Sequence, residues 1–148
     1  MNGALKQIRW PVVVGAGVAA FIVGGVWYAA LFPTQWMSLH GFSDERMEAV
    51  QARFALNMLV TIALDVVRAA VVATLLAAIG RRGGANGAAL ALVLWLGVSL
   101  PYHATFALAS GAPIGAFAID ASYRLTALLV TGAVVGAWGL KGQTGDQA

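Results

Sequence analysis

Two charged residues interrupt the apolar run "TIALDVVRAAVVATLL", which spans residues 61–76. Asp65 and Arg68 are three positions apart, so on a helix they lie on the same face and can form an ion pair. Inside a membrane, such residues either pair with one another or line a route for protons, ions or solutes. The types and spacing of these two residues therefore indicate either a structural ion pair or a transport site.

A polar stripe extends along the same segment. With about 100° of rotation per residue, the stripe formed by Asn57, Thr61, Asp65 and Arg68 spans about 80° of the helix surface. An Asp or Arg at the centre of a membrane helix costs about 2.5–3.5 kcal/mol to insert. The stripe is therefore expected to face protein or water and not lipid.

Matching polar residues occur in two later apolar runs. The polar face of residues 114–140 consists of Asp120, Tyr123, Arg124 and Thr131. One side of residues 84–109 carries Trp95, Ser99, Tyr102, His103, Phe106 and Ser110. Together the three stripes predict a polar network inside a helix bundle.

The depth of each residue, counted inward from the outer helix ends, predicts which members of the network meet. Asp65 and Arg124 are each about 11 or 12 residues deep, which predicts an ion pair between them at mid-membrane. His103 and Asp120 are each about 7 residues deep, which predicts a shallower contact. The local pairs Asp65–Arg68 and Asp120–Arg124 compete with this arrangement, because residues three or four apart are neighbours on a helix. A four-member network would satisfy both.

The same residue types also allow an acid–base set made of Asp120, His103 and either Ser99 or Tyr102. The sequence has no nucleophile motif, HExxH pattern or DxD pattern beside them, so we expect no enzyme activity. His40 and His103 alone make an incomplete zinc site, and the absence of Cys excludes thiolate ligands and disulfides. We therefore expect neither a metal nor another cofactor.

The composition indicates the elements that must position these residues. Hydrophobic residues make up 60% of the 148 residues and charged residues only 10%, which indicates a membrane protein. Four apolar runs are long enough to cross a ~30 Å hydrocarbon core, namely residues 11–32, 54–80, 84–109 and 114–140. Short turns at "RRGG" and "SGAP" make the last three runs antiparallel neighbours. The expected fold is all-α, a single membrane domain over residues 1–148 with four transmembrane helices in an antiparallel bundle.

Local signals refine the ends and shapes of these helices. Ser43 followed by Asp44 and Glu45 is typical of a helix start. The second helix is therefore expected to begin near residue 44, outside the membrane, and to run inward without a break. Pro101 removes the hydrogen bond to the Gly97 carbonyl, which predicts a kink in the third helix.

The distribution of Lys and Arg predicts the orientation. The segments expected on one side of the membrane carry Lys6, Arg9, Arg81, Arg82 and Lys141, whereas those on the other side carry Arg46 and Arg53. The positive-inside rule then places both termini in the cytoplasm, as expected for a multi-pass protein of the bacterial cytoplasmic (inner) membrane. The first run is too long for the apolar region of a signal peptide and ends without a small-residue cleavage site, so we expect it to be retained.

The lipid bilayer is the partner that these features predict directly. The net charge is +3, but Lys and Arg are scattered and form no patch, which argues against nucleic-acid binding. Close helix approach is favoured by the small residues Ala16, Ala20, Gly24, Gly132 and Gly136. Packing within the chain is the expected role of these residues, and a homo-oligomer stays an open alternative. The sequence identifies no small-molecule ligand.

The stretch "GGVWYAALFPTQWMSLHGFS", together with "LWLGVSLP" and "AIDASYRLTALLVTGAVVGAW", resembles the bacterial membrane family known as domain of unknown function 1761 (DUF1761). The resemblance covers about Ile8 to Trp138. Its most specific element is the motif formed by Gly25, Trp27 and Tyr28, with Trp36 beyond it. The resemblance implies a four-helix membrane protein and, as the family name says, no established activity, substrate or catalytic residue.

Two functions stay open for the polar network. The favoured hypothesis is structural: the charges set helix register, and the protein acts in assembly or interaction within the membrane. The alternative is a proton-coupled or small-solute transporter or channel, working as an oligomer, in which the Asp, Arg and His residues take part in transport. The two hypotheses differ in whether the network is closed or hydrated.

Overall fold

The computed structural model describes residues 5–141, most of which are helical. The elements are α2 (Trp10–Gly25), the π-helical segment η1 (Val26–Leu31), α3 (Pro33–Leu39), α4 (Asp44–Ala52), α5 (Phe54–Ala78), α6 (Gly84–Leu94), the π-helical segment η2 (Trp95–Ser99), α7 (Leu100–Ser110) and α8 (Ile114–Trp138). Within the described residues, β pairing is confined to an isolated bridge between Ile8 and Leu140. The expectation of an all-helical chain is confirmed.

Four stretches are long and apolar enough to cross a membrane: Trp10–Leu31, Phe54–Ala78, Gly84–Ser110 and Ile114–Trp138. Their bounds differ from those expected from the sequence by one or two residues. Two of the stretches are composite, because α2 continues into η1 and α6 continues through η2 into α7. The chain is a membrane protein by the length and apolar character of these helices.

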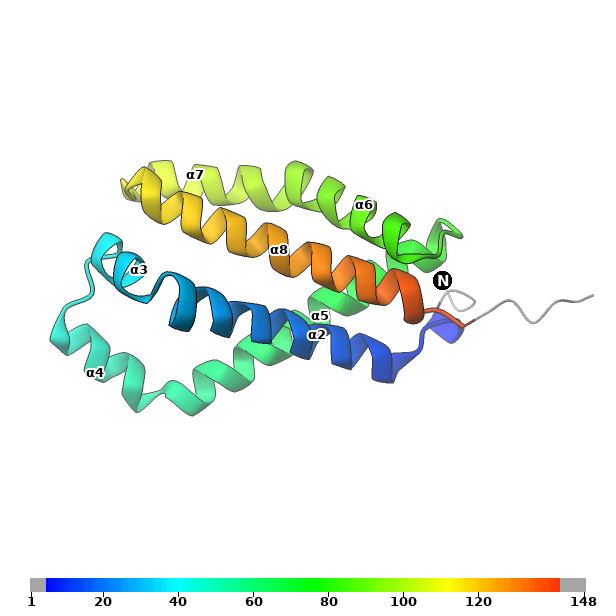
Figure 1. Ribbon diagram of the computed structural model, residues 1–148, viewed down its shortest axis with the longest axis horizontal. Helices are drawn as coiled ribbons and strands as arrows, with labels where there is room; N and C mark the ends of the chain where they lie inside the picture. The colour runs from blue at the N-terminus through cyan, green and yellow to red at the C-terminus, as the bar shows by residue number, and fades with distance from the viewer. Residues whose placement is uncertain (1–4, 142–148) are drawn as a thin grey trace, which may run out of the picture.

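Helix α8 lies at the centre of the arrangement (Figure 1). It packs against α2, α5 and α6 and, nearer its N-terminal end, against α3, η2 and α7. Helix α5 crosses this group diagonally, and its N-terminal part diverges from the other helices together with α4. The residues of α5 that are buried begin at Asp65, so the first half of the helix contributes nothing to the core. The end of the protein that contains α3 and α4, called the outer half from here on, is therefore more open than the end that contains residues 79–83 and 139–141, called the inner half.

Glycines bring α6 and α8 into very close contact in the inner half. A Cβ atom at Gly87 would collide with the backbone carbonyl of Gly132, and one at Gly136 would collide with the Gly83 carbonyl. Ala16 and Ala20 of α2 are likewise fully buried. The small residues identified in the sequence thus serve packing within the chain, as expected. This packing closes the inner half of the bundle.

The region of Pro101 differs from the simple kink expected from the sequence. The chain widens into η2 over Trp95–Ser99, and the Leu100 N–H donates to the Trp95 carbonyl five residues earlier. Pro101 follows as the second residue of α7, directly after the widened segment. The proline is accommodated by a change of helical register, with Gly97 inside the widened segment.

The start of α4 follows its sequence signal, because the Arg46 N–H donates to the Ser43 side chain at 3.3 Å. The expectation of an unbroken helix from residue 44 into the membrane is wrong. Arg53 adopts φ −112° and ψ 13°, which lies outside the helical region and separates α4 from α5. The break lets the polar helix α4 and the apolar helix α5 point in different directions (Figure 1).

Candidate functional site

The carboxylate of Asp120 on α8 is the acceptor for donors from the first span and the helix after it. Its Oδ1 accepts hydrogen bonds from the Tyr28 hydroxyl at 2.9 Å and from the Trp36 indole N–H at 3.0 Å. Its Oδ2 lies 3.2 Å from Nε2 of His40 and 3.9 Å from Nε2 of His103. We call these five residues the Asp120 cluster. The predicted contact between Asp120 and His103 is confirmed, although His40 lies closer.

The π-helical segment η1 presents two neighbouring side chains to α8. Trp27 donates from its indole N–H to the Ile119 carbonyl at 3.1 Å, and Tyr28 reaches Asp120, the next residue of α8. Adjacent residues of a regular α-helix point about 100° apart, so both would not ordinarily face one helix. The widened turn of η1 changes this relation. The motif residues Trp27 and Tyr28 therefore attach the end of the first span to α8.

Helix α3 supplies the other two donors from one face. Trp36 and His40 are four residues apart, which places them one above the other on a helix. Their rings lie 4.8 Å apart, centroid to centroid, and both side chains reach the carboxylate of Asp120. Helix α3 thus lies as a cap on the end of α8, held there by Asp120.

His40 has a polar neighbour at each ring nitrogen. Nδ1 lies 3.0 Å from the Trp36 carbonyl, and Nε2 lies 3.2 Å from Oδ2 of Asp120. The imidazole is therefore held between the backbone of α3 and the carboxylate on α8.

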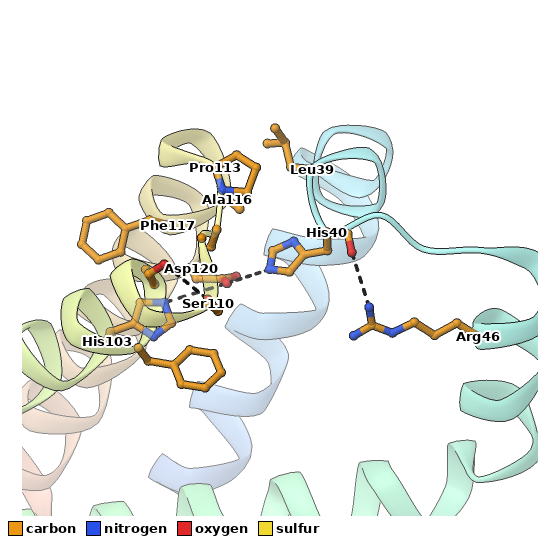
Figure 2. Close-up of a pocket in the computed structure, with 13 residues that line it drawn as sticks. Leu39, His40, Arg46, His103, Ser110, Pro113, Ala116, Phe117 and Asp120 are labelled. Atoms are coloured by element: carbon orange, nitrogen blue, oxygen red, sulfur yellow. Dashed lines mark hydrogen bonds and ion pairs between the residues drawn. The ribbon is translucent and has the colours of Figure 1, made fainter.

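A pocket of about 390 Å³ opens beside the Asp120 cluster between α3–α4 and α7–α8. Figure 2 shows His40 and His103 approaching Asp120 from opposite sides. Arg46 of α4 donates to the His40 carbonyl at 3.4 Å, and its guanidinium lies 4.5 Å from the centre of the Phe42 ring. Phe106 and Phe117 add aromatic walls. The pocket combines both imidazoles, a carboxylate and a guanidinium in one site.

A second group of charges lies deeper, on α5 and α8. Oδ1 of Asp65 is 2.9 Å from Nη1 of Arg68, and Asp65 is only 1% exposed. The predicted Asp65–Arg124 ion pair is wrong, because within residues 5–141 the only partner of Asp65 within 4.0 Å is Arg68. Arg68 is one turn along the same helix, so a short Asp side chain reaches it directly. Arg124 still lies near enough to act on Asp65 through its charge.

The predicted local pair Asp120–Arg124 is also absent within the described residues, because the Asp120 oxygens are occupied by donors from the first span. The two charged groups are connected through tyrosines instead. The rings of Tyr28 and Tyr123 meet edge to face, with their centroids 5.0 Å apart. Tyr123 in turn lies beside Arg68. Polar side chains therefore continue from the outer pocket to mid-span.

Other residues of the predicted network line a cavity or bond within their own helices. Ser99, Arg68 and Arg124 line a cavity of about 240 Å³ between α5, α6–η2 and α8. Thr61 and Thr131 bond to carbonyls of their own helices, at 2.8 Å in both cases.

Two predicted members lie outside the network. Tyr102 is 75% exposed, and Asn57 lies exposed on the diverging part of α5. The expectation that these two belong to an interior network is wrong. Tyr102 follows η2 and Pro101, which change the helical register, and Asn57 precedes the point where α5 joins the core. Gly25 and Gly97 are exposed, and a Cβ at either would contact nothing.

Sequence reasoning missed His40 as a partner of Asp120. The signal that could have found it is the spacing of Trp36 and His40 directly after Pro33, a residue favoured in the first turn of a helix. What no spacing shows is that α3 folds back over α8. Among residues 5–141, no three His, Asp or Glu side chains are placed to hold a metal ion.

The chain matches a known protein family. The family described as "Protein of unknown function (DUF1761)" matches residues 10–136. This range contains the motif residues of η1, all of the Asp120 cluster and the deeper charges. No curated protein and no solved structure is detectably similar to the chain.

Proposed function

The chain belongs to DUF1761, a family of proteins of unknown function, and we propose that its polar network is structural: it fixes the helices of a small membrane protein in register. The observation that carries this proposal is the convergence of Tyr28, Trp36 and His40 on the carboxylate of Asp120. These donors are 80 to 92 positions away from Asp120 in sequence. A carboxylate that accepts several hydrogen bonds from distant parts of the chain stabilises a single arrangement of the helices.

The proposal includes the placement of the molecule. Four antiparallel spans cross the bacterial inner membrane, with both termini in the cytoplasm and α3–α4 outside. The Lys and Arg bias supports this orientation. The bilayer is the partner of the apolar outer surface, and assembly with a second copy is the form of interaction that we propose. No catalytic role is assigned to the cluster.

Cross-linking of the cap to α8 tests the structural role. Cδ1 of Leu39 lies 3.1 Å from the position that a Gly115 Cβ would take, so cysteines introduced at both positions report whether α3 is docked. The chain has no other Cys. We expect rapid joining by a short bismaleimide in the Leu39→Cys/Gly115→Cys protein and a severalfold slower reaction when Asp120→Ala is added.

Asp44→Ala is the matched control, because it removes an exposed carboxylate from the first turn of α4. Equal joining with and without the Asp120 carboxylate, at equal thermal stability in detergent, would contradict the structural proposal. A loss of joining in the Asp44→Ala protein would mean that the reaction reports general loosening and not the Asp120 contacts.

Transport is the second candidate, and the outer pocket favours it. A pocket of about 390 Å³ gives access to the His40–Asp120 pair, and side chains continue from there to Asp65. Ionisable residues at membrane depth often mark such routes. Reconstituted vesicles under proton and solute gradients test it, with Asp65→Asn and Asp120→Asn beside the wild type. Flux by the wild type that both variants lose supports transport, whereas a folded wild type without flux contradicts it.

A further inference from the structure

Two arginines line the cavity of about 240 Å³ on the deeper side of the network. Arg68 of α5 and Arg124 of α8 approach it from opposite helices, and Ser99 of η2 adds a hydroxyl. The other five lining residues are all Val or Leu. We call this cavity the arginine pocket. It is separate from the outer pocket, which lies beside Asp120 and shares no lining residue with it.

The charges around the arginine pocket do not balance. Asp65 pairs with Arg68, and the described residues place no carboxylate within 4.0 Å of Arg124. Both guanidinium groups keep their protons in proteins. The Asp120 carboxylate does not compensate, because its oxygens are bonded to Tyr28, Trp36 and His40 and make no ion pair with Arg124. At mid-span, two guanidinium groups therefore share a single paired carboxylate, and one positive charge has no partner among the described residues.

The polar atoms of Arg124 point to the same conclusion. Its Nε is buried and has no hydrogen-bond partner. A buried donor without a partner is uncommon in proteins and requires an explanation. The N–H groups of a guanidinium form a planar fork that matches a carboxylate in shape and charge. A carboxylate in the arginine pocket would supply both the missing acceptor and the missing negative charge.

We infer that the arginine pocket binds a monocarboxylate that carries an aliphatic chain. A single negative charge matches the single positive charge that the residues leave. The Val and Leu walls suit an aliphatic chain, and about 240 Å³ is below the usual 300–1,000 Å³ of drug-sized ligands, so the part inside is small. The ligand can arrive as a free short-chain carboxylate from water or as the head of a fatty acid in the bilayer. This inference does not depend on whether the Asp120 cluster is structural.

Binding to the full-length protein in neutral detergent tests the inference. The probes are radiolabelled hexanoate, hexanol as its neutral counterpart, and oleate, with protein-free micelles subtracted. We expect saturable binding of hexanoate or oleate at one site per chain, and hexanol binding at least tenfold weaker. Hexanoate binding identifies a free solute as the source, and oleate binding alone identifies the membrane. Absence of saturable binding of both carboxylates, or equal binding of hexanol, would overturn the inference.

Two variants locate the site. Arg124→Gln removes the unbalanced charge, and Val98→Trp fills the pocket while keeping both arginines; Val98 is 65% exposed, so the larger side chain has room. We expect each to weaken carboxylate binding at least tenfold, whereas Arg53→Gln, which removes a charge outside the pocket, leaves it unchanged. Because Val98→Trp leaves every charge in place, it tests the site even if Arg124→Gln fails to fold. Wild-type affinity in a folded Val98→Trp protein would place the binding elsewhere and overturn the assignment.

Discussion

Asp120 shows how much one side chain can organise in a membrane protein. Its oxygens accept from a phenol, an indole and an imidazole, and all of these donors come from the first span and the α3 cap. These bonds are partly buried, and a buried donor left without its acceptor is costly. The hydrogen bonds therefore constrain the residue types at the donor positions as tightly as they constrain Asp120 itself.

The loss of one hydrogen-bond donor to Asp120 should lower the free energy of unfolding measurably. Tyr28→Phe removes the hydroxyl that bonds to the Asp120 carboxylate, and hydrogen bonds to charged groups contribute about 1.5–3 kcal/mol. We expect the free energy of unfolding in detergent to fall by about that amount. Tyr102→Phe is the control, because Tyr102 is 75% exposed. Equal effects of the two substitutions would show that the Tyr28 bond adds nothing to stability.

At the scale of the elements, the helices meet in two different ways. In the inner half, α6 and α8 approach through glycines until their backbones touch. In the outer half, the contacts of α3 and η1 with α8 include hydrogen bonds from aromatic side chains to the Asp120 carboxylate and the Ile119 carbonyl. The π-helical segments η1 and η2 occur where the chain changes from the first kind of contact to the second. Each segment contains a Trp whose indole N–H donates to a carbonyl of α8: Trp27 to Ile119 and Trp95 to Ala121.

The glycine contact predicts a large effect from a small change. Gly132→Val places a branched side chain against the Gly87 carbonyl and the Ala91 methyl group. Overpacking of this kind costs about 1–3 kcal/mol or more, because the backbones must move apart. We expect a clear loss of thermal stability in detergent. Gly15→Val introduces the same side chain where nothing lies within 4 Å, and it should behave like the wild type.

At the scale of the whole molecule, the two ends of the bundle are unlike. The inner end is held together by small residues and by backbone bonds that join the segments before α2 and after α8, such as Arg9 N–H to the Gly139 carbonyl at 2.8 Å. At the outer end, α5 diverges from the other helices, and the Asp120 pocket lies between α3–α4 and α7–α8. The orientation decides which compartment can reach the Asp120 pocket.

Cysteine labelling tests the proposed orientation directly, because the chain has no Cys of its own. Glu48→Cys lies on exposed α4, and Ala85→Cys lies exposed at the start of α6, at the opposite end of the bundle. We expect a membrane-impermeant maleimide to label Glu48→Cys on the outside of intact cells and Ala85→Cys only after permeabilisation. The reverse pattern would invert the proposed topology and place the outer pocket in the cytoplasm.

The sequence by itself determined the helical class, the four apolar stretches, the Ser43 start of α4 and the family. These features depend on local pattern: runs of apolar residues, a capping side chain and a short aromatic motif. It also identified Asp65, Arg68, Asp120 and Arg124 as interior charges, because a charge in an apolar helix must avoid lipid.

Only the tertiary structure decided which charges meet. Helical depth alone paired Asp65 with Arg124, but a side chain pairs with the nearest suitable group, and Arg68 on the same helix is closer than any group on α8. The break at Arg53, the two π-helical segments and the fold-back of α3 each change direction or register by amounts that no periodic pattern encodes. These changes bring His40 to Asp120 and leave Arg124 without a carboxylate, because the partner of a polar group depends on how whole helices pack.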